Sequence, residues 1–158
     1  MKIKEITQKL TLKSIYNPPS TFEAIETLHQ KLITINTRDE PIILGMDSNL
    51  HHRLWNSKGY HHENSQARHL IQTCGSRGFK LISPRHVPTF LGPTGAAATI
   101  DLSWANNQAL KLLSSSETQL KNHSSDHQSI ILNPSLDKTA IQTKESHIKM
   151  RLDKLNEK

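Results

Sequence analysis

The chain has few aromatic residues, a single cysteine and no long apolar run, and each scarcity excludes a class of protein. Of its 158 residues, 34% are hydrophobic and 4% aromatic, so a core must consist largely of Ile and Leu. Cys74 cannot form an intrachain disulfide, and one cysteine excludes a cysteine-rich zinc framework. Apolar runs such as Ile42-Ile43-Leu44 do not exceed three residues, whereas a membrane span needs roughly 20. Residues 1–5 do not lead into a signal-peptide core. We therefore expect one soluble, intracellular domain.

The net charge is +6, and the excess of positive charge lies at the two ends of the chain. Residues 1–13 carry +3 and residues 134–158 carry +2, which leaves +1 for the 120 residues between them. Binding to phosphates is driven by Lys and Arg. Because basic ends are commonly solvated tails or helix faces, this distribution favours nucleic-acid binding only weakly.

Hydrophobic periodicity predicts strands mixed with helices. An alternating pattern at residues 10–16 favours a strand that ends at Asn17-Pro18-Pro19-Ser20. The Ser-x-x-Glu spacing that begins at Ser20 is typical of a capping box before a helix. The complete prediction comprises strands at 10–16, 42–46, 79–82 and 128–132, a hairpin of 88–91 with 98–104, and helices at 22–35, 67–74 and from 143 onward.

This order of elements indicates a layered α/β or α+β domain. We place the domain at residues 10–133 and interpret 134–158 as a charged tail or terminal helix. The helix at 67–74 is expected to end at Gly75 and Gly78, and the strand at 42–46 to be buried on both faces.

Three polar features stand at predicted strand ends, where sites are commonly found. Asp47 and Asn49 follow the buried strand. The Asp47 carboxylate can bind a metal or a proton, and the Asn49 amide can donate to a phosphate oxygen. The alternative is an Asx turn that ends the strand. Asp101 lies inside an apolar strand and needs a His or metal partner unless it faces water at a sheet edge. Asp126-His127 can supply a metal ligand and a general base, or can belong to a polar loop.

Taken together, these motifs resemble the endonuclease/exonuclease/phosphatase superfamily, and in particular the apurinic-like endonuclease domains of non-LTR (LINE-type) retrotransposons. The resemblance covers residues 10–132. Its most specific part is Asp-x-Asn-x-His-His-x-x-Trp at 47–55. The other matching segments occur in the family's order: 15–20 (Ile-Tyr-Asn-Pro-Pro-Ser), 88–90 (Pro-Thr-Phe), 99–105 (Thr-Ile-Asp-Leu-Ser-Trp-Ala) and 125–127 (Ser-Asp-His).

The resemblance implies a role for each matching residue. Asp47 would handle the attacking or leaving oxygen, and Asn49 would bind the scissile phosphate. Asp101 would orient His127, which would act as general base or stabilise the pentacovalent phosphate. Further implied roles are a metal-associated carboxylate for Asp126 and a phosphate contact for Tyr16. Many relatives carry an Asn three residues after this tyrosine; here that position is Pro19, and neighbouring Asn17 is the alternative.

The resemblance also implies a fold, a cofactor and partners. The fold would be a four-layer β-sandwich truncated at its N-terminus, because the acids upstream of Asp47 include no match to the family's principal metal ligand, a Glu. Mg²⁺ fits a site of carboxylates and water better than Zn²⁺ does, and Mn²⁺ is an alternative. DNA would be the substrate. A missing N-terminal half or a reverse transcriptase region would be a further partner, and the protein would be located in the nucleus. Whether such a truncated copy is active alone stays open, and its sheet would leave apolar surface exposed.

Two alternatives compete with a metal-dependent phosphodiesterase. The pairs His51-His52 and His61-His62 suggest a metal-binding module, although adjacent loop histidines usually face solvent. The other alternative is a non-catalytic nucleic-acid-binding retrotransposon remnant. Cys74 has helical spacing with Leu70 and Ile71 and is interpreted as a core residue rather than a nucleophile.

Overall fold

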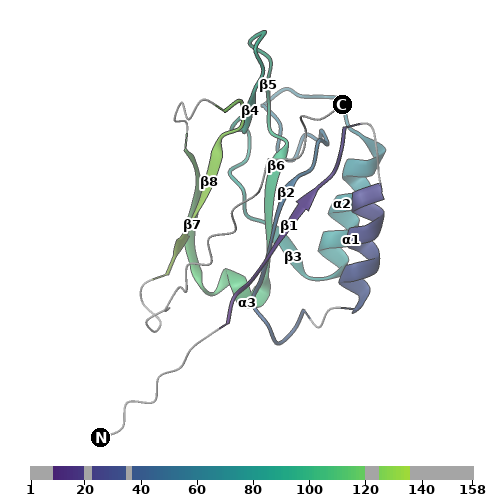
Figure 1. Ribbon diagram of the computed structural model, residues 1–158, viewed down its shortest axis with the longest axis vertical. Helices are drawn as coiled ribbons and strands as arrows, with labels where there is room; N and C mark the ends of the chain where they lie inside the picture. Colours follow the sequence, from purple (N-terminus) through teal and green to yellow (C-terminus); the bar gives the residue numbers. More distant parts are fainter. Residues whose placement is uncertain (1–8, 20–22, 35–36, 120–124, 136–158) are drawn as a thin grey trace, which may run out of the picture.

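The computed structural model describes residues 9–19, 23–34, 37–119 and 125–135, which form three layers (Figure 1). The middle layer is a sheet in the order β1 (Thr11–Tyr16), β2 (Ile42–Asp47), β6 (Asp101–Asn106) and β3 (Phe79–Leu81). Helices α1 (Glu23–Thr34) and α2 (Ser65–Ser76) cover one face, and the pair β7 (Leu113–Gln119) and β8 (Ser129–Pro134) lies on the other. A hairpin of β4 (Phe90–Leu91) and β5 (Ala97–Ala98) and the short helix α3 (Asn107–Leu110) complete the described part.

The apolar pattern of β2 explains why this strand is central. Ile42, Leu44 and Met46 pack in one cluster with side chains of α1, α2 and β6, whereas Ile43 packs in a second cluster with Ala105 and side chains of β7 and β8. Side chains alternate between the two faces of a strand. β2 is therefore buried on both sides, as its sequence predicts.

Most predicted elements are present, with three corrections. Helix α2 continues through Gly75 to Ser76, and the turn after it uses Gly78 at φ 76. Residues 98–104 do not form one hairpin arm: β5 pairs with β4, while β6 joins the central sheet. Strand β7 and helix α3 were not predicted. The helix predicted from residue 143 lies outside the described residues. None of the described helices is long or apolar enough to cross a membrane.

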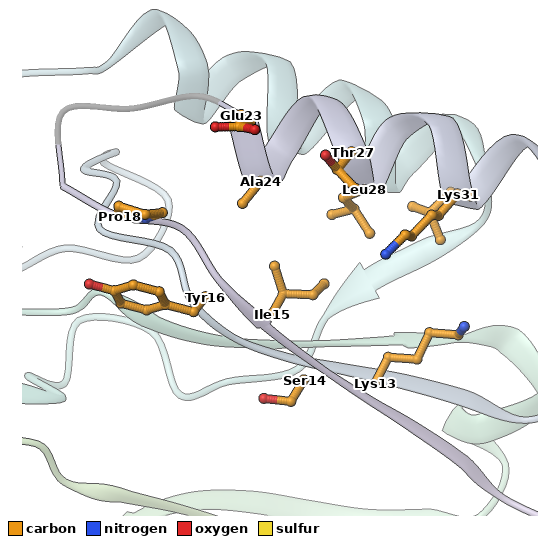
Figure 2. Close-up of a pocket in the computed structure, with 11 residues that line it drawn as sticks. Lys13, Ser14, Ile15, Tyr16, Pro18, Glu23, Ala24, Thr27, Leu28 and Lys31 are labelled. Atoms are coloured by element: carbon orange, nitrogen blue, oxygen red, sulfur yellow. The ribbon is translucent and has the colours of Figure 1, made fainter. Parts of the chain in front are cut away.

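Strand β1 forms an edge of the sheet and exposes apolar side chains. Within the described part of the chain, it pairs with β2 alone. Leu12 is 67% exposed and Tyr16 is 62% exposed. An open groove of about 540 Å³ runs between β1 and α1. Figure 2 shows Tyr16 at one end of this groove and Lys13 and Lys31 at the other.

Candidate active site

The register of three neighbouring strands brings polar side chains to one end of the sheet. Tyr16 pairs with Asp47 across the parallel β1–β2 ladder, and Asp47 pairs with Asp101 across the antiparallel β2–β6 ladder. Paired residues in a sheet point to the same face. The three side chains therefore form a row across β1, β2 and β6 on the face opposite to the helices.

His127 lies beside this row and contacts Asp101. Its Nδ1 donates to Asp101 Oδ2 at 3.0 Å and is 3.2 Å from Oδ1. The side chain of Asp101 is 21% exposed and that of His127 is 37% exposed. The backbone of His127 bridges to Phe90, and the two rings meet edge to face. Asp101 thus has the partner that its apolar surroundings require, and the contact leaves Nε2 as the proton acceptor of a neutral imidazole.

The titration of His127 and Asp47 reflects their proximity. Burial alone would lower the pKa of His127, but the hydrogen bond to Asp101 and the surrounding carboxylates raise this pKa above its ordinary value. Those carboxylates are Asp101, Asp47 and Asp126. The pKa of Asp47 is also raised, first by burial and then by the charge of Asp101, against smaller opposing effects of His127 and Asn49. Neighbouring groups whose pKa values are shifted by each other's charge are candidates for proton transfer.

The loop after β2 holds Asn49 in a fixed place. Asn49 adopts a left-handed backbone (φ 48), and its Nδ2 donates to the carbonyl oxygen of Asn17 at 2.8 Å. Asn17 is fully buried and donates in turn to the carbonyl oxygen of Ser48 at 2.8 Å. Asn17, considered above as a substitute for a family Asn, therefore supports the loop that carries Asn49.

Thr89 is a supporting residue to which the sequence interpretation gave no role. Its Oγ1 is fully buried and accepts hydrogen bonds from the backbone N–H groups of Ile100 at 3.1 Å and Asp101 at 2.9 Å. Its carbonyl oxygen accepts from the N–H of Gln128 at 2.7 Å. Thr89 thus joins the start of β6 to the segment that carries His127. The signals in the sequence are a hydroxyl between two apolar residues and the place of Thr89 in the matching segment 88–90.

The described residues contain one group that fits a metal ion. Ligand atoms of Asp47, Asp101 and His127 lie within 4.8 Å of one another. Asp47 Oδ1 is buried and has no hydrogen-bond partner among the described residues. A buried carboxylate oxygen without a partner is costly unless a cation or a proton reaches it. Asp126 is exposed and outside this group, although its charge acts on His127.

The two histidine pairs do not form a second metal site within the described residues. His52 lies 3.4 Å from Glu63, and its Nδ1 accepts from the N–H of Leu54. His51 contacts Asn56 and stacks on Tyr60. Burial lowers the pKa of both histidines. These rings therefore serve the packing of the loop after β2. Cys74 is buried in the core, and burial raises the pKa of its thiol to about 12.

The layered fold is of the endonuclease/exonuclease/phosphatase type, with a carboxylate-supported histidine at the ends of its central strands. The chain belongs to the endonuclease-reverse transcriptase family, whose model matches residues 10–131. The sequence resemblance to this superfamily is thereby confirmed, as is the α/β fold class.

The chain is similar to two solved structures of nucleases. The endonuclease domain of TRAS1, a telomere-specific non-LTR retrotransposon, matches with a TM-score of 0.60 and 23% identity over 78% of this chain and 56% of that chain. The 3′-5′ exonuclease NExo of Neisseria meningitidis matches with a TM-score of 0.49 and 14% identity over 71% of this chain and 52% of that one. The chain thus spans about half the length of each. No curated protein matches the chain.

Proposed function

We propose that the chain is a metal-dependent phosphodiesterase that nicks DNA. The observation that carries this proposal is the cluster of Asp47, Asp101 and His127, whose ligand atoms lie within 4.8 Å of one another. Membership in an endonuclease family supports nuclease chemistry at this cluster. Phosphodiester cleavage needs an in-line water, a group that takes its proton, and positive charge near the phosphate oxygens.

His127 is the general base in this proposal, and Asp101 is its positioning residue. The Nδ1–H of His127 is held by Asp101 at 3.0 Å, so Nε2 is the nitrogen that accepts a proton from the attacking water. The carboxylate fixes the imidazole tautomer and stabilises the imidazolium that forms. The raised pKa of His127 makes it a stronger base than a free histidine.

Asn49 and Tyr16 are the proposed contacts to the scissile phosphate. The Asn49 amide is fixed by its bond to Asn17, and Tyr16 is 62% exposed at the end of β1 beside Asp47. An amide N–H and a phenol can both donate to phosphate oxygens. Asp47 handles the attacking or leaving oxygen, because burial and the charge of Asp101 raise its pKa and so make its carboxylate a better proton acceptor than a free one.

Mg²⁺ is the proposed cofactor, with Mn²⁺ as an alternative. Asp47, through its unpartnered Oδ1, would hold it, and exposed Asp126, which lies outside the Asp47, Asp101 and His127 group, is the further carboxylate proposed to join it. Oxygen ligands suit Mg²⁺, which keeps several waters and is usually held by only one or two carboxylates together with substrate phosphates. The bound metal would neutralise charge on the phosphate. We further propose that the chain acts on nuclear DNA together with a reverse transcriptase region, the activity that its family's description couples to the endonuclease.

Nicking of supercoiled plasmid tests the proposal. The chain, alone and combined with the upstream half of a related domain, is incubated with plasmid and Mg²⁺ or EDTA. We expect nicking with Mg²⁺ only, and a loss of about 10²- to 10⁴-fold in His127→Ala, the range for removing a general base. His61→Ala is the matched control, because His61 is exposed and lies outside the metal-compatible group.

Two outcomes would contradict this function. Nicking that persists in His127→Ala would defeat the residue assignment. Absence of nicking in every combination, with salt-sensitive DNA binding retained, would identify a non-catalytic nucleic-acid-binding remnant.

A further inference from the structure

The groove between β1 and α1 places an open strand edge beside apolar side chains. Among the described residues, β1 pairs with β2 alone, so the backbone groups of its other edge can pair with a further strand. Ile15 of β1 and Leu28 and Leu32 of α1 line the groove, which has a volume of about 540 Å³. An unpaired strand edge next to apolar side chains is the arrangement by which a sheet accepts an additional, extended strand.

The two ends of the groove carry opposite charges. Figure 2 shows Lys13 of β1 and Lys31 of α1 at one end and Glu23 at the other. This order arises because Glu23 begins α1 and Lys31 lies in its last turn, while α1 runs back along β1. None of these three side chains forms an ion pair with a described residue. A complementary occupant of the groove therefore places acidic groups beside the lysines and a basic group beside Glu23.

The face of β1 opposite to the helices adds an apolar requirement. Leu12 and Tyr16 lie on this face, because they pair with Ile43 and Asp47 of β2, and they are 67% and 62% exposed. The side chains of a strand added beside β1 would alternate between the two faces. Every second side chain would lie over the groove, and the others would lie beside Leu12 and Tyr16. The edge therefore fits a strand in which charged and apolar residues alternate.

The charges of the edge favour a protein segment over two other occupants. A second copy of the chain that paired along β1 would bring its own Lys13 to the same edge, and lysines on edge strands discourage such self-pairing. A nucleic acid would meet the Glu23 carboxylate at one end of the groove and apolar side chains between the ends, and neither attracts a phosphate backbone. A polypeptide segment can satisfy the strand edge, the charges and the exposed apolar side chains together.

We propose that β1 and the groove beside it bind an extended segment of a partner protein, which adds a strand to the central sheet. The segment carries acidic residues at the end where Lys13 and Lys31 lie and a basic residue near Glu23, and these charged residues alternate with apolar ones. Hydrogen bonds between the two backbones supply affinity, and the charged side chains supply specificity. The charged residues that select the segment lie outside the proposed phosphodiesterase site, so the proposal does not rest on the nuclease function.

Chemical-shift mapping by ¹H–¹⁵N NMR tests the proposal. The full chain is titrated with a short synthetic peptide in which valine alternates with charged residues, glutamate at one end and lysine at the other. We expect the peptide to shift the amides of β1 and to leave those of β3, at the opposite edge of the sheet, in place. The β1 amides that point away from β2 should also exchange more slowly with solvent, because the added strand accepts hydrogen bonds from them.

Charge reversal on each side of the contact tests the role of the lysines. Lys13→Glu and Lys31→Glu should each weaken binding of the glutamate-containing peptide by about tenfold, because each removes a charged partner. A peptide with lysine in place of each glutamate should bind these variants better than it binds the unmodified chain. This gain also shows that the variants are folded.

Lys80→Glu is the matched control, because Lys80 is an exposed lysine of β3 at the other edge of the same sheet. This variant should bind the peptide as the unmodified chain does. Equal weakening by Lys80→Glu, or β1 amides that do not respond to the peptide, would overturn the proposal. Tighter binding of a single-stranded DNA oligonucleotide that is lost in Lys13→Glu and Lys31→Glu would also overturn it, and would identify a nucleic-acid surface. These outcomes concern binding alone and leave the proposed nuclease function untouched.

Discussion

The two faces of the central sheet use the same strands for different purposes. Toward the helices, β2 presents Ile42, Leu44 and Met46, each at most 5% exposed. Toward β7 and β8, it presents Ile43 and ends in half-exposed Asp47. The helix face therefore consists of buried apolar side chains, whereas the other face carries ionisable side chains at the strand ends in place of apolar ones. Neighbouring residues of β2 point to opposite faces, so residues that stabilise the core alternate with residues on the face of the candidate site. Variants on the helix face should therefore change the free energy of unfolding, and variants on the other face should change nicking.

The largest effect on stability is expected from the helix face. Leu44 is fully buried, and Leu44→Ala should lower the free energy of unfolding by about 2–5 kcal/mol. Leu12→Ala, at a position that is 67% exposed, should change it by less than about 0.5 kcal/mol. Urea denaturation of both variants measures the difference. Similar losses in the two variants would mean that β1 is covered in solution.

On the opposite face, Asp101→Asn should reduce nicking more than it reduces stability. We expect a loss of about 10- to 100-fold, the usual cost of removing a residue that orients a functional histidine. The bond to Asp101 raises the pKa of His127 against the effect of burial, so the rise of activity with pH should move to lower pH in the variant. A pH–rate profile measures this shift. An unchanged midpoint would show that His127 is not the titrating base.

Thr89→Val tests the hydrogen bonds that connect the two halves of the site. The change keeps the shape of the side chain but removes the acceptor for two N–H groups, the buried one of Ile100 and the partly buried one of Asp101. It should lower the free energy of unfolding by about 1–3 kcal/mol. Thr118→Val is the matched control, because Thr118 Oγ1 is buried with no hydrogen-bond partner among the described residues. Thermal denaturation should show loss in the first variant and none in the second.

The smallest expected effect has the opposite sign. The pKa of Asp47 is raised in the fold, first by burial, so its charged form opposes folding at neutral pH. In EDTA, Asp47→Asn should raise the Tm slightly. The gain in the free energy of unfolding should be well under about 1 kcal/mol, because solvent screens the half-exposed site. Nicking with Mg²⁺ should be lost in the same variant. The gain should vanish as the pH falls and Asp47 becomes protonated. A lower Tm at neutral pH would mean that the Asp47 carboxylate stabilises the fold.

Local patterns predicted the elements and residues whose signals lie within a few positions of one another. The run at 42–46 and the polar group after it identified β2 and Asp47, and a carboxylate in an apolar strand indicated that Asp101 has a partner. Strand β7 was not predicted, because Ser114, Ser115 and Ser116 leave it without an alternating apolar pattern. The strand is formed through its antiparallel pairing with β8. Thr89 was missed for a related reason: its acceptor role depends on β6, which lies beyond the β4–β5 hairpin.

The row formed by Tyr16, Asp47 and Asp101 has a consequence for insertions and deletions. Each member is in place only because two ladders keep one register. Removal of one residue within β2 would turn every later side chain of the strand to the opposite face, moving Asp47 toward the helices and Met46 toward the polar end. The turn at residues 92–95 carries no such constraint and can change in length. Among homologues of this chain, insertions and deletions should therefore be found mainly in that turn. A homologue with an insertion or deletion within residues 42–47 should have lost both the core and the candidate site.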